Sequence, residues 1–427
     1  MKILVVGGGG REHAIIRKLR ENPEVTEIYA LPGNAGIAAD AVCVNVKATD
    51  IDGIVEFAKG HPVDFAVVAP DDPLALGCVD RLHALGIPCF GPDARAARIE
   101  ASKVFAKDLM KKYGIPTAAY EVFDDAEKAL AYVKACPLPT VVKADGLALG
   151  KGVVIAFTRD EAESAVRSAM IDGAFGASGS RIVVEEFLEG PEVSVLAFTD
   201  GKTVKPMVSS MDHKRVGDGD VGPNTGGMGT IAPNPCYTPA VAERCMKEIF
   251  LPTIAAMRSE GCPFKGCLYF GLMVTKDGPK VIEYNCRFGD PETQVVLPLL
   301  ESDLLTVMQA CEDGTLADTP VAFSDGAACC VMLASGGYPG KYEKGKVIDL
   351  GNAERMATLY HSGTALNEAG AFVNAGGRVL GVCCTADDLE TAVERAYRAA
   401  AEVKWDGMIL RRDIGKRALG ILKKEKN

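Results

Sequence analysis

The stretch PTVVKADGLALGKGVVIAF, residues 139–157, places an apolar strand that carries Lys143 before a glycine loop, and a second apolar strand after it. This pattern predicts a β-loop-β unit. It differs from a P-loop, which needs four residues between its glycines, then Lys and Ser or Thr, and then a helix. Here three residues separate the two glycines, and Lys151 is followed by Gly152 and a strand. A glycine hairpin with a lysine on each side can fold over a triphosphate and supply positive charge, whereas the alternative is an ordinary mobile hairpin with solvated lysines.

The segment GPKVIEYNCRFGDPE, residues 278–292, predicts a strand over 280–286 followed by a turn. Side chains alternate along a strand, so we expect Glu283, Asn285 and Arg287 on one face, and Ile282 and Tyr284 on the other. One carboxylate and one amide oxygen are enough protein ligands for Mg²⁺, because this ion keeps several waters and substrate phosphates. The guanidinium can clamp a carboxylate or a γ-phosphate. The alternative is the solvated face of an edge strand, which accounts less well for the FGDPE turn.

Residues 1 to about 100 predict a small doubly wound α/β domain, because strand-like runs alternate with helical stretches. A glycine turn leads from the first strand into a helix, where free N–H groups, the helix dipole and Arg11 suit an anion such as phosphate. An NAD site is disfavoured, because the third position of G-x-G-x-x-G falls on Glu12 and the second strand ends without an acidic residue. A glycine turn that only packs helix against strand fits the loop equally well. The predicted strands lie at 2–6, 27–31, 65–69 and 87–90.

The centre of the chain combines a capped helix with strand-rich segments. Ser102 predicts a helix over about 102–112 and puts Lys103 in its first turn, where a cation opposes the helix dipole and a nearby anion would offset that cost; a solvent-exposed lysine is the alternative. The segment RIVVEEFLEGPEVSVLAF predicts two strands joined by a hinge at 187–190. Hinge backbone groups could pair with adenine and the glutamate after the hinge with ribose hydroxyls, unless the segment is a plain hairpin. The glycine tract 217–229 has no periodicity and predicts a loop.

Composition narrows the class of protein. A chain of 427 residues favours several domains. Its net charge of -10, without a Lys/Arg stripe, makes nucleic acid an unexpected partner. No run is apolar for about 18 residues, so we expect neither export nor a membrane span. The 14 cysteines show no CxxC and no Cys/His ligand spacing, which is typical of reduced core residues in the cytoplasm.

Taken together, these segments resemble the ATP-grasp ligases, and among them the phosphoribosylamine-glycine ligases (glycinamide ribonucleotide synthetases) of purine synthesis. The resemblance runs almost from end to end. The long glycine tract and RFGDPE are specific to these ligases and close relatives, whereas the glycine hairpin marks the superfamily. The matching strings are GREHA (10–14), PGNAG (32–36), KADGLALGKGVV (143–154), DHKRVGDGDVGPNTGGMG (212–229), RFGDPETQ (287–294), GGYPGKY (336–342) and RRDIG (411–415).

The resemblance implies a plan of three parts: an α/β substrate domain at 1–101, an ATP-grasp domain at 102–327 with a mobile lid at about 120–190, and a small α+β domain at 328–427. It implies an enzyme that uses ATP and Mg²⁺ or Mn²⁺ to join glycine to 5-phosphoribosylamine through glycyl phosphate. No enzyme nucleophile is required. It also implies a cytoplasmic monomer, with room for transient contact with the enzyme that makes phosphoribosylamine.

The resemblance assigns roles by position. ATP would be held by Lys103, Lys143, Gly150, Lys151 and Gly152, with Glu185, Glu186, Phe187 and Leu188 at the adenine and Glu192 at the ribose. The metal ligands would be Glu283 and Asn285. Phosphoribosylamine would meet Gly10, Arg11, Gly33 and Asn34, and further substrate contacts would come from Asp71, Asn224 and Thr225. Asp212, Lys214, Arg287 and Asp290 would surround glycine and the transferring phosphate. His13 and His213 would be structural or hydrogen-bond donors.

Three positions depart from the family pattern: Gly9 stands where Asn is usual, Ala69 begins a segment that is usually Gly-Pro-Glu, and Met211 replaces Gln. Three other functions are alternatives. A ligase that carboxylates aminoimidazole ribotide or biotin would depend on bicarbonate. A nucleotide-binding module without turnover is disfavoured by the intact metal ligands and lysines. An NAD oxidoreductase is disfavoured by Glu12.

Overall fold

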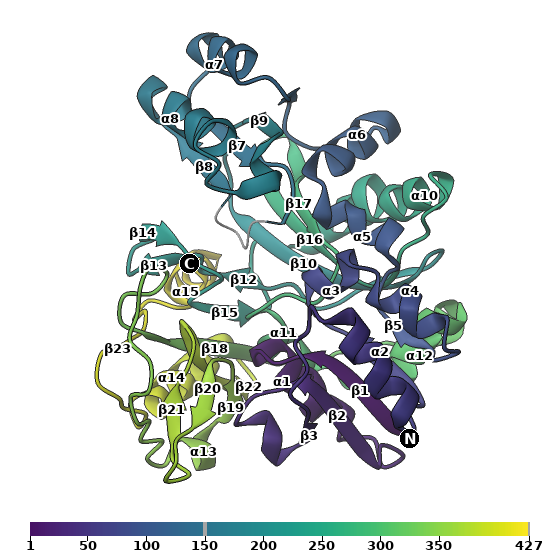
Figure 1. The fold of residues 1–427 in the computed structure, drawn as a ribbon. Helices are drawn as coiled ribbons and strands as arrows, with labels where there is room; N and C mark the ends of the chain where they lie inside the picture. The colour runs from purple at the N-terminus through teal and green to yellow at the C-terminus, as the bar shows by residue number, and fades with distance from the viewer. Residues whose placement is uncertain (148–151, 426–427) are drawn as a thin grey trace.

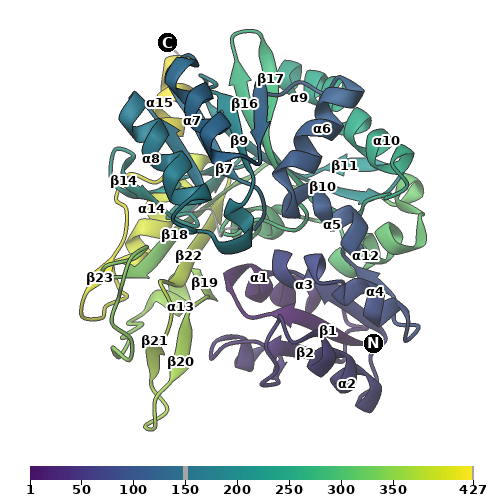
Figure 2. The same cartoon turned by 45° about the horizontal axis from the view of Figure 1, so that its top comes forward.

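A computed structural model describes residues 1–147 and 152–425 of the chain. Its amino-terminal and carboxy-terminal parts lie side by side, and a small lid projects at the opposite end of the molecule (Figures 1 and 2). The central sheet lies between the lid and these two parts. No helix among the described residues is long and apolar enough to cross a membrane. All fourteen cysteines are free thiols, as expected from their spacing.

The amino-terminal part is a five-stranded parallel sheet in the order β3-β2-β1-β4-β5. Its central strands β1 and β4 are apolar and buried apart from Lys2 at the start of β1, because helices cover both faces of a parallel sheet. The predicted doubly wound domain is therefore confirmed. The strands are β1 (Lys2–Gly7), β2 (Glu27–Pro32), β3 (Val42–Cys43), β4 (Phe65–Val68) and β5 (Cys89–Phe90), and the helices are α1 (Gly10–Leu19), α2 (Ile51–Gly60), α3 (Asp71–Ala75), α4 (Cys78–His83) and α5 (Ala94–Ala101).

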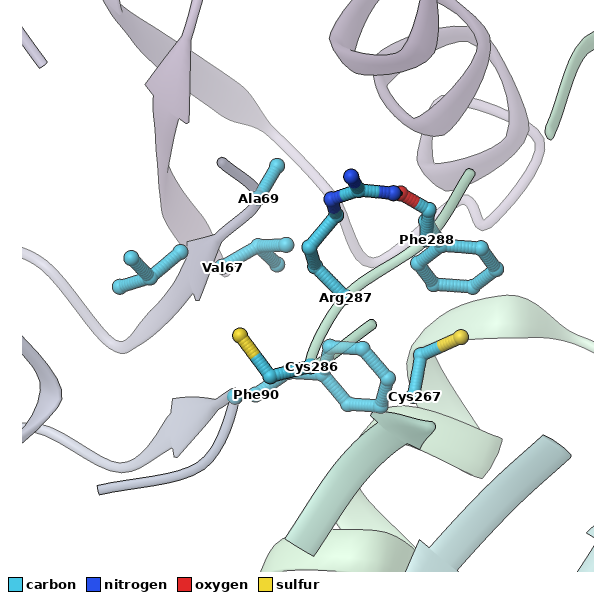
Figure 3. A pocket seen from close by; sticks show the side chains of 9 residues that line it. Val67, Ala69, Phe90, Cys267, Cys286, Arg287 and Phe288 are labelled. Atoms are coloured by element: carbon cyan, nitrogen blue, oxygen red, sulfur yellow. The ribbon is translucent and has the colours of Figure 1, made fainter. Parts of the chain in front are cut away.

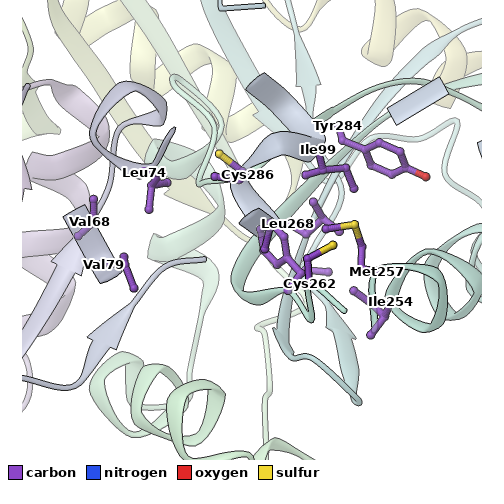
Figure 4. Packing of buried hydrophobic residues seen from close by; sticks show 14 of the residues in the cluster. Val68, Leu74, Val79, Ile99, Ile254, Met257, Cys262, Leu268, Tyr284 and Cys286 are labelled. Carbon is purple, nitrogen blue, oxygen red and sulfur yellow. The ribbon is translucent and has the colours of Figure 1, made fainter. Parts of the chain in front are cut away.

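The central part is an antiparallel sheet in the order β11-β10-β16-β17. Apolar residues of its strands and helices form one continuous core with the amino-terminal part, which contributes Val68 and Leu74 beside Ile99, Leu268 and Tyr284 (Figure 4). These two parts are therefore packed as one body. The elements are α6 (Lys103–Tyr113), β10 (Glu192–Asp200), β11 (Val204–Pro206), α9 (Pro239–Cys245), α10 (Leu251–Ser259), β16 (Lys265–Thr275), β17 (Gly278–Asn285), α11 (Thr293–Val296) and α12 (Leu304–Asp313).

The lid is a separate antiparallel sheet in the order β6-β9-β7-β8. Two helices close it, and it has its own core, in which Val133, Val166 and Val184 take part. The β-loop-β prediction is confirmed at β7 and β8, which pair antiparallel. Its elements are β6 (Tyr120–Phe123), α7 (Ala126–Ala135), β7 (Thr140–Ala144), β8 (Val153–Ala156), α8 (Arg159–Met170) and β9 (Ile182–Glu186).

The carboxy-terminal sheet has the order β12-β15-β18-β22-β19, with β23 beside β18. Two of its strands come from residues 211–232, so this sheet joins the glycine tract of the central part to the carboxy-terminal part. Helix α14 packs on β18 and β22. The elements are β12 (Met211–Asp212), β15 (Gly229–Ala232), β18 (Ala327–Ser335), α13 (Ala353–Met356), β19 (Thr358–His361), β20 (Thr364–Leu366), β21 (Phe372–Asn374), β22 (Arg378–Ala386), α14 (Leu389–Ala400), β23 (Met408–Ile409) and α15 (Lys416–Glu425).

The prediction of a loop over 217–229 was wrong in part, because residues 217, 221–224 and 229 lie in strands, whereas 218–220 and 225–228 do not. The chain there forms a hairpin of β13 (Arg215–Gly217) and β14 (Val221–Asn224) and then enters β15. Its glycines hide the strand pattern, and its stability comes from distant residues. The guanidinium of Arg411 lies 2.7 Å from the carboxylate of Asp220, and the Gly219 N–H donates to Asp413 at 2.8 Å.

Candidate active site

Lys103 lies where the helix start was predicted. The Ser102 hydroxyl accepts a hydrogen bond from the Phe105 N–H at 3.2 Å, so it caps α6 as its position predicts. The Lys103 ammonium donates to the Gly146 carbonyl at 2.8 Å, at the entry to the glycine loop. Burial lowers the pKa of Lys103, and the Glu283 carboxylate opposes that shift.

The glycine loop is only partly described. Gly150 and Lys151, both predicted to bind phosphate, lie outside the described residues. Gly152 is buried at the start of the returning strand, where its carbonyl accepts from the Ala144 N–H at 2.8 Å. The backbone at this position is therefore part of the hairpin.

Lys143 on β7 points at a buried carboxylate. Its ammonium lies 3.0 Å from Glu185 Oε2 and donates to the Ile282 carbonyl at 3.0 Å. A second lysine, Lys107 on α6, approaches the same carboxylate oxygen at 3.1 Å. The sequence prediction missed Lys107, although its position four residues after Lys103 puts both lysines on one face of the helix.

The segment predicted to hold adenine follows β9. Leu188 packs with Ala118, Met273 and Ile282 in a small apolar cluster, and Phe187 lies 6.1 Å from the ring of Phe157. The Glu186 N–H donates to the Ala119 carbonyl at 2.9 Å. β9 and β10 belong to different sheets, so the hinge prediction holds and the plain hairpin is excluded. Glu192 begins β10, and its carboxylate lies 3.2 Å from the Lys214 ammonium.

The predicted alternation in the strand expected to bind the metal was wrong at one position. Gly271 pairs with Glu283 and Leu272 pairs with Val281, so β17 has an irregularity that leaves Ile282 as an extra residue. Ile282 therefore joins the apolar cluster around Leu188, whereas Tyr284 is buried in the central core. This bulge brings an apolar side chain to the adenine segment and leaves Glu283 beside the lysines.

Glu283 is the electrostatic centre of the site. Burial raises the pKa of its carboxyl, but Lys214, Lys143 and Lys103 outweigh burial and hold the pKa below its ordinary value. The nearest of these ammonium groups, on Lys214, lies 3.9 Å from Glu283 Oε1. Three parts of the fold thus place cations around one ionised carboxylate.

Asn285 and Arg287 continue this arrangement. Arg287 donates to Asn285 Oδ1 at 3.2 Å and to Glu100 Oε1 at 3.0 Å. Glu100 on α5 also accepts from the Cys286 N–H at 2.7 Å. The predicted clamp is therefore bound to a buried carboxylate in this structure. Arg287 also lines a cavity of about 10 Å³ with Ala69 (Figure 3), which has room for no more than a single water molecule.

A cleft of about 500 Å³ opens at the amino-terminal glycine turn. Arg11 lies in its wall, where its guanidinium is 2.7 Å from Glu12 Oε1 and donates to the Phe288 carbonyl at 3.1 Å. The Gly9 N–H donates to Glu12 Oε2 at 2.6 Å, so Glu12 organises the turn. Its lining residues are Gly7, Gly8, Gly9, Arg11, Glu12, Pro32, Lys47, Ala48, Thr49, Pro70 and Asp290.

Gly10, Gly33 and Asn34 lie beside this cleft but serve packing. A Cβ atom on Gly10 would lie 2.6 Å from the Ser362 hydroxyl, and one on Gly33, at φ +68°, would lie 2.3 Å from the Cys43 sulfur. The Asn34 amide donates to three backbone carbonyls and accepts from two backbone N–H groups. Its side chain is thus fully committed within the protein.

The remaining predicted residues lie on three segments. Asp71 begins α3, next to the Pro70 that lines the cleft. Asp290 lies between Gln294, which donates to it at 2.8 Å, and Arg378 at 3.3 Å; burial raises its pKa, but Arg378 and Arg11 outweigh burial and lower it. Asp212 is different, because burial and the Glu292 carboxylate raise its pKa well above the ordinary value.

Asn224 and Thr225 lie on the glycine-tract hairpin. Asn224 ends β14 and pairs with Arg215 across the hairpin. The Thr225 hydroxyl and N–H both donate to the Lys214 carbonyl, at 2.8 and 2.7 Å. Thr225 therefore fixes the backbone that carries Lys214.

Comparison with known proteins covers nearly the whole chain. Residues 1–100, 101–293 and 328–417 match the N domain, the ATP-grasp (A) domain and the C domain of phosphoribosylglycinamide synthetase. A phosphoribosylamine-glycine ligase of Rhizobium meliloti (strain 1021) is 49% identical over 420 residues, which are 98% of this chain and 99% of that protein. The chain belongs to the phosphoribosylglycinamide synthetase family.

Solved structures agree with membership of the synthetase family. The crystal structure of a phosphoribosylamine-glycine ligase from Thermotoga maritima has a TM-score of 0.87 and 36% identity, and the match covers 97% of this chain and 100% of that one. The biotin carboxylase domain of a Hydrogenobacter thermophilus 2-oxoglutarate carboxylase has a TM-score of 0.70 at 18% identity, covering 96% and 91%, and therefore shares the fold alone. The predicted ATP-grasp fold and the predicted family are confirmed.

The two histidines in synthetase motifs have structural surroundings. His13 is buried, accepts from the His361 N–H at 2.9 Å through Nδ1, and donates to Asp40 through Nε2 at 3.0 Å. His213 is also buried, between the Gly229 carbonyl at 3.1 Å and the Gly415 N–H at 3.3 Å. Burial lowers the pKa of both imidazoles, so both are neutral near pH 7 and neither has a free nitrogen.

Proposed function

We propose that this chain joins glycine to 5-phosphoribosylamine with ATP and releases glycinamide ribonucleotide, ADP and phosphate in purine biosynthesis. Membership of the phosphoribosylglycinamide synthetase family supports the reaction, and the name of the Rhizobium meliloti relative supports the substrates. The observation that carries the proposal is the ionised Glu283 among Lys103, Lys143 and Lys214. A metal-bound triphosphate needs this combination of one hard anionic ligand and several cations.

The chemistry needs positioning and charge neutralisation. A glycine carboxylate oxygen attacks the γ-phosphorus of ATP, the bond to the β-phosphate oxygen breaks, and ADP leaves with glycyl phosphate formed. The amine of phosphoribosylamine then attacks the glycyl carbonyl carbon. The C–O bond to phosphate breaks, and the amine loses a proton as the amide forms. An enzyme nucleophile is not required, which agrees with the structural surroundings of His13 and His213.

The proposed metal ligands are Glu283 and Asn285. Their chemistry fits Mg²⁺ or Mn²⁺, because the carboxylate is ionised and the amide oxygen, which accepts one bond from Arg287, has a second lone pair. No cluster of three or more His, Cys, Asp and Glu side chains suits a metal in the part of the chain that the structure describes. Phosphate oxygens and water would therefore complete the coordination, and the bound ion would neutralise phosphate charge. The Hydrogenobacter thermophilus domain, which shares the fold, was solved with the magnesium salt of ADP.

The two substrates would meet at Asp290. This residue lines the 500 Å³ cleft at the amino-terminal glycine turn, and Arg287, three residues before it in the same turn, contacts Asn285. We therefore assign the cleft to phosphoribosylamine, and the region between Asp290, Asp212 and Lys214 to glycine and the transferring phosphate. The backbone at Gly10 and Gly33, rather than the committed Asn34 amide, would face the ribose phosphate.

The decisive assay is ADP release with freshly prepared phosphoribosylamine, with and without glycine. ADP release that requires both substrates and Mg²⁺ supports the assignment. Turnover that requires bicarbonate in place of glycine would instead identify a carboxylating ligase, and ADP release that is independent of glycine would refute the proposal.

Glycyl phosphate can be tested separately by isotope transfer. Glycine labelled with ¹⁸O in its carboxylate should deliver one labelled oxygen to each phosphate released, because the attacking carboxylate oxygen leaves with phosphorus. Unlabelled phosphate, formed together with glycinamide ribonucleotide, would exclude the acyl phosphate while leaving the overall reaction intact.

Cytoplasmic location, a monomeric state and transient contact with the enzyme that makes phosphoribosylamine also belong to the proposal. Fourteen free thiols, nearly all of them buried, support a reducing compartment. Analytical ultracentrifugation at micromolar concentration tests the monomer, and a second sedimenting species at twice the mass would contradict it.

A further inference from the structure

Two lysines share one oxygen of a buried carboxylate. Lys107 and Lys143 lie 3.1 and 3.0 Å from Glu185 Oε2, and all three side chains are at most 5% exposed. The other oxygen, Glu185 Oε1, is buried and has no hydrogen-bond partner among the described residues. An unsatisfied buried acceptor costs roughly 1 to 3 kcal/mol, so this oxygen is suited to a donor brought by a ligand.

The two lysines differ in what else holds them. Lys107 donates to the Thr117 hydroxyl at 2.8 Å and lies 5.6 Å from the centre of the Tyr120 ring. Thr117 is itself fixed, because its hydroxyl donates to the Val281 carbonyl at 2.7 Å. Lys143 has one further contact, to the Ile282 carbonyl on the strand that carries Glu283. Lys107 is thus anchored away from Glu283, whereas Lys143 lies next to the metal-binding strand.

This difference matters when a triphosphate enters. The proposed function gives Lys143 to the phosphates, so its ammonium would turn away from Glu185. Because Lys107 is anchored by Thr117 and Tyr120, it remains beside Glu185 Oε2 and holds the carboxylate in place through their ion pair.

We propose that Lys107 is a specificity-determining positioning residue, whose ion pair with Glu185 Oε2 orients the carboxylate so that its unpaired Oε1 reads the 6-amino group of adenine. This inference rests on the proposed adenine site, at the cluster around Leu188 that follows Glu185. A carboxylate oxygen accepts from the amino group of adenine, whereas the 6-oxo group of guanine, an acceptor, is repelled. Without Lys107 beside Oε2 the Glu185 carboxylate would lose the contact that orients it, so its other oxygen would no longer face the 6-amino group and the preference would be lost.

The test compares nucleotides that differ at position 6, bound to the full chain with Mg²⁺ and without glycine or phosphoribosylamine. The probes are ATP, GTP and purine riboside 5′-triphosphate, which has no 6-substituent, and binding is measured by calorimetry. The wild-type protein should prefer ATP over each of the other two by at least tenfold. In Lys107→Met, affinity for ATP should fall about tenfold, and the preference over purine riboside triphosphate should shrink to less than threefold.

Two further variants serve as a control and as an independent test of the Glu185 carboxylate. Lys111→Met changes an exposed lysine on the same helix, whose ammonium lies 5.7 Å from the centre of the Tyr120 ring, and the variant should bind all three nucleotides like the wild type. Glu185→Gln offers an amide that can donate to a 6-oxo group, so it should narrow the ATP to GTP ratio even where Lys107→Met folds poorly. In steady-state assays of Lys107→Met, KM for ATP should rise about tenfold while kcat stays within twofold.

The inference would be overturned by unchanged discrimination in a folded Lys107→Met protein or, where that variant does not fold, by unchanged discrimination in Glu185→Gln. A fall in kcat with KM for ATP unchanged would also overturn it, because it would place Lys107 in the chemical step. The binding measurements need neither glycine nor phosphoribosylamine, so an error in the assigned substrates leaves this test intact. Conversely, a loss of the nucleotide preference says nothing about glycine.

Discussion

Asn34 connects the amino-terminal and carboxy-terminal parts of the synthetase through one side chain. Its Nδ2 donates to the carbonyls of Gly8, His361 and Ser362 at 2.9, 2.8 and 3.2 Å. Its Oδ1 accepts from the N–H groups of Gly36 and Ile37, both at 2.9 Å. Replacing Asn34 by alanine removes all of these bonds, whereas Asn34→Ser keeps a hydroxyl that can accept from the local N–H groups.

The magnitude follows from the number of hydrogens. An amide has two N–H hydrogens, so the three carbonyls share two bonds, and the oxygen accepts two more. At about 1 kcal/mol of net stabilisation for each hydrogen bond, Asn34→Ala should cost about 4 kcal/mol and Asn34→Ser about 2 kcal/mol. The difference in unfolding free energy between the two variants measures the bonds that Asn34 accepts in the local turn. The loss of unfolding free energy in the serine variant measures the bonds that link the amino-terminal and carboxy-terminal parts.

Native-state hydrogen exchange gives the needed resolution. In Asn34→Ala, the Gly36 and Ile37 amides should exchange faster by a factor that corresponds to about 4 kcal/mol, and the urea midpoint should fall. In Asn34→Ser, these amides should keep about half of that protection. The control is Asn352→Ala, an exposed asparagine bonded only weakly to Glu402, which should change stability by less than about 0.5 kcal/mol. An Asn34→Ala variant whose free energy of unfolding lies within about 1 kcal/mol of the wild-type value would refute this reasoning.

Three other predictions follow from the geometry. Glu283→Gln removes the anionic metal ligand, so kcat should fall on the order of a hundredfold with part of the loss recovered at high Mg²⁺, and wild-type rates with an unchanged Mg²⁺ dependence would remove Glu283 from the metal site. Burial lowers the pKa of His361 to about 3, so near pH 5 the folded state binds fewer protons than the unfolded state. The contribution of His361 to the free energy of unfolding is therefore fully present above about pH 6.5, and lowering the pH to 5 should reduce this free energy by about 2 kcal/mol in urea titrations. The His361→Gln variant should lack this loss. Arg411→Met leaves Asp413 and Asp220 without their guanidinium, so the Gly219 amide should exchange faster by a factor that corresponds to about 2 kcal/mol in opening free energy. An unchanged exchange rate would show that other contacts hold the hairpin.

The parts of the fold that could be predicted are those whose cause is local. The apolar runs of β1 and β4 predict buried parallel strands because both faces of such a sheet are covered. Ser102 predicts the start of α6 because a cap depends on neighbours within three residues. The glycine hairpin was predicted as β-loop-β because both flanking strands are apolar.

The errors arose where the cause is distant in sequence. The hairpin at 215–224 is held by Arg411 and Asp413, about two hundred positions away, and its own glycines carry no strand pattern. The bulge at Ile282 comes from pairing with β16, which the sequence of β17 alone does not encode. The bonds of the Asn34 amide to residues 8, 361 and 362 could not be predicted either, because these partners are distant in sequence.

The candidate site shows the same division. Glu283 and Asn285 could be proposed as metal ligands because metal chemistry restricts the residue types, and the structure confirms that both lie on one strand. Lys107 could not, because a lysine on a helix is usually solvated, and its role depends on a carboxylate 78 positions later. Lys47 and Glu12 line the cleft only because β2, β3 and α1 meet there.

The distribution of cores explains where this enzyme can move. The central sheet shares one apolar core with the amino-terminal part, and a second core joins residues of all three parts, so separating these bodies would expose large apolar surfaces. The lid instead has a core of its own, and several of its links to the rest are polar: Lys143 to the Ile282 carbonyl, Asp145 to the Ser102 hydroxyl, and Lys103 to the Gly146 carbonyl. Breaking each such bond costs only about 1 kcal/mol net. Two of these links use the lysines that we assign to phosphate; in that proposal a triphosphate would take over the contacts that hold the lid, and nucleotide binding would be coupled to lid movement through the same two ammonium groups.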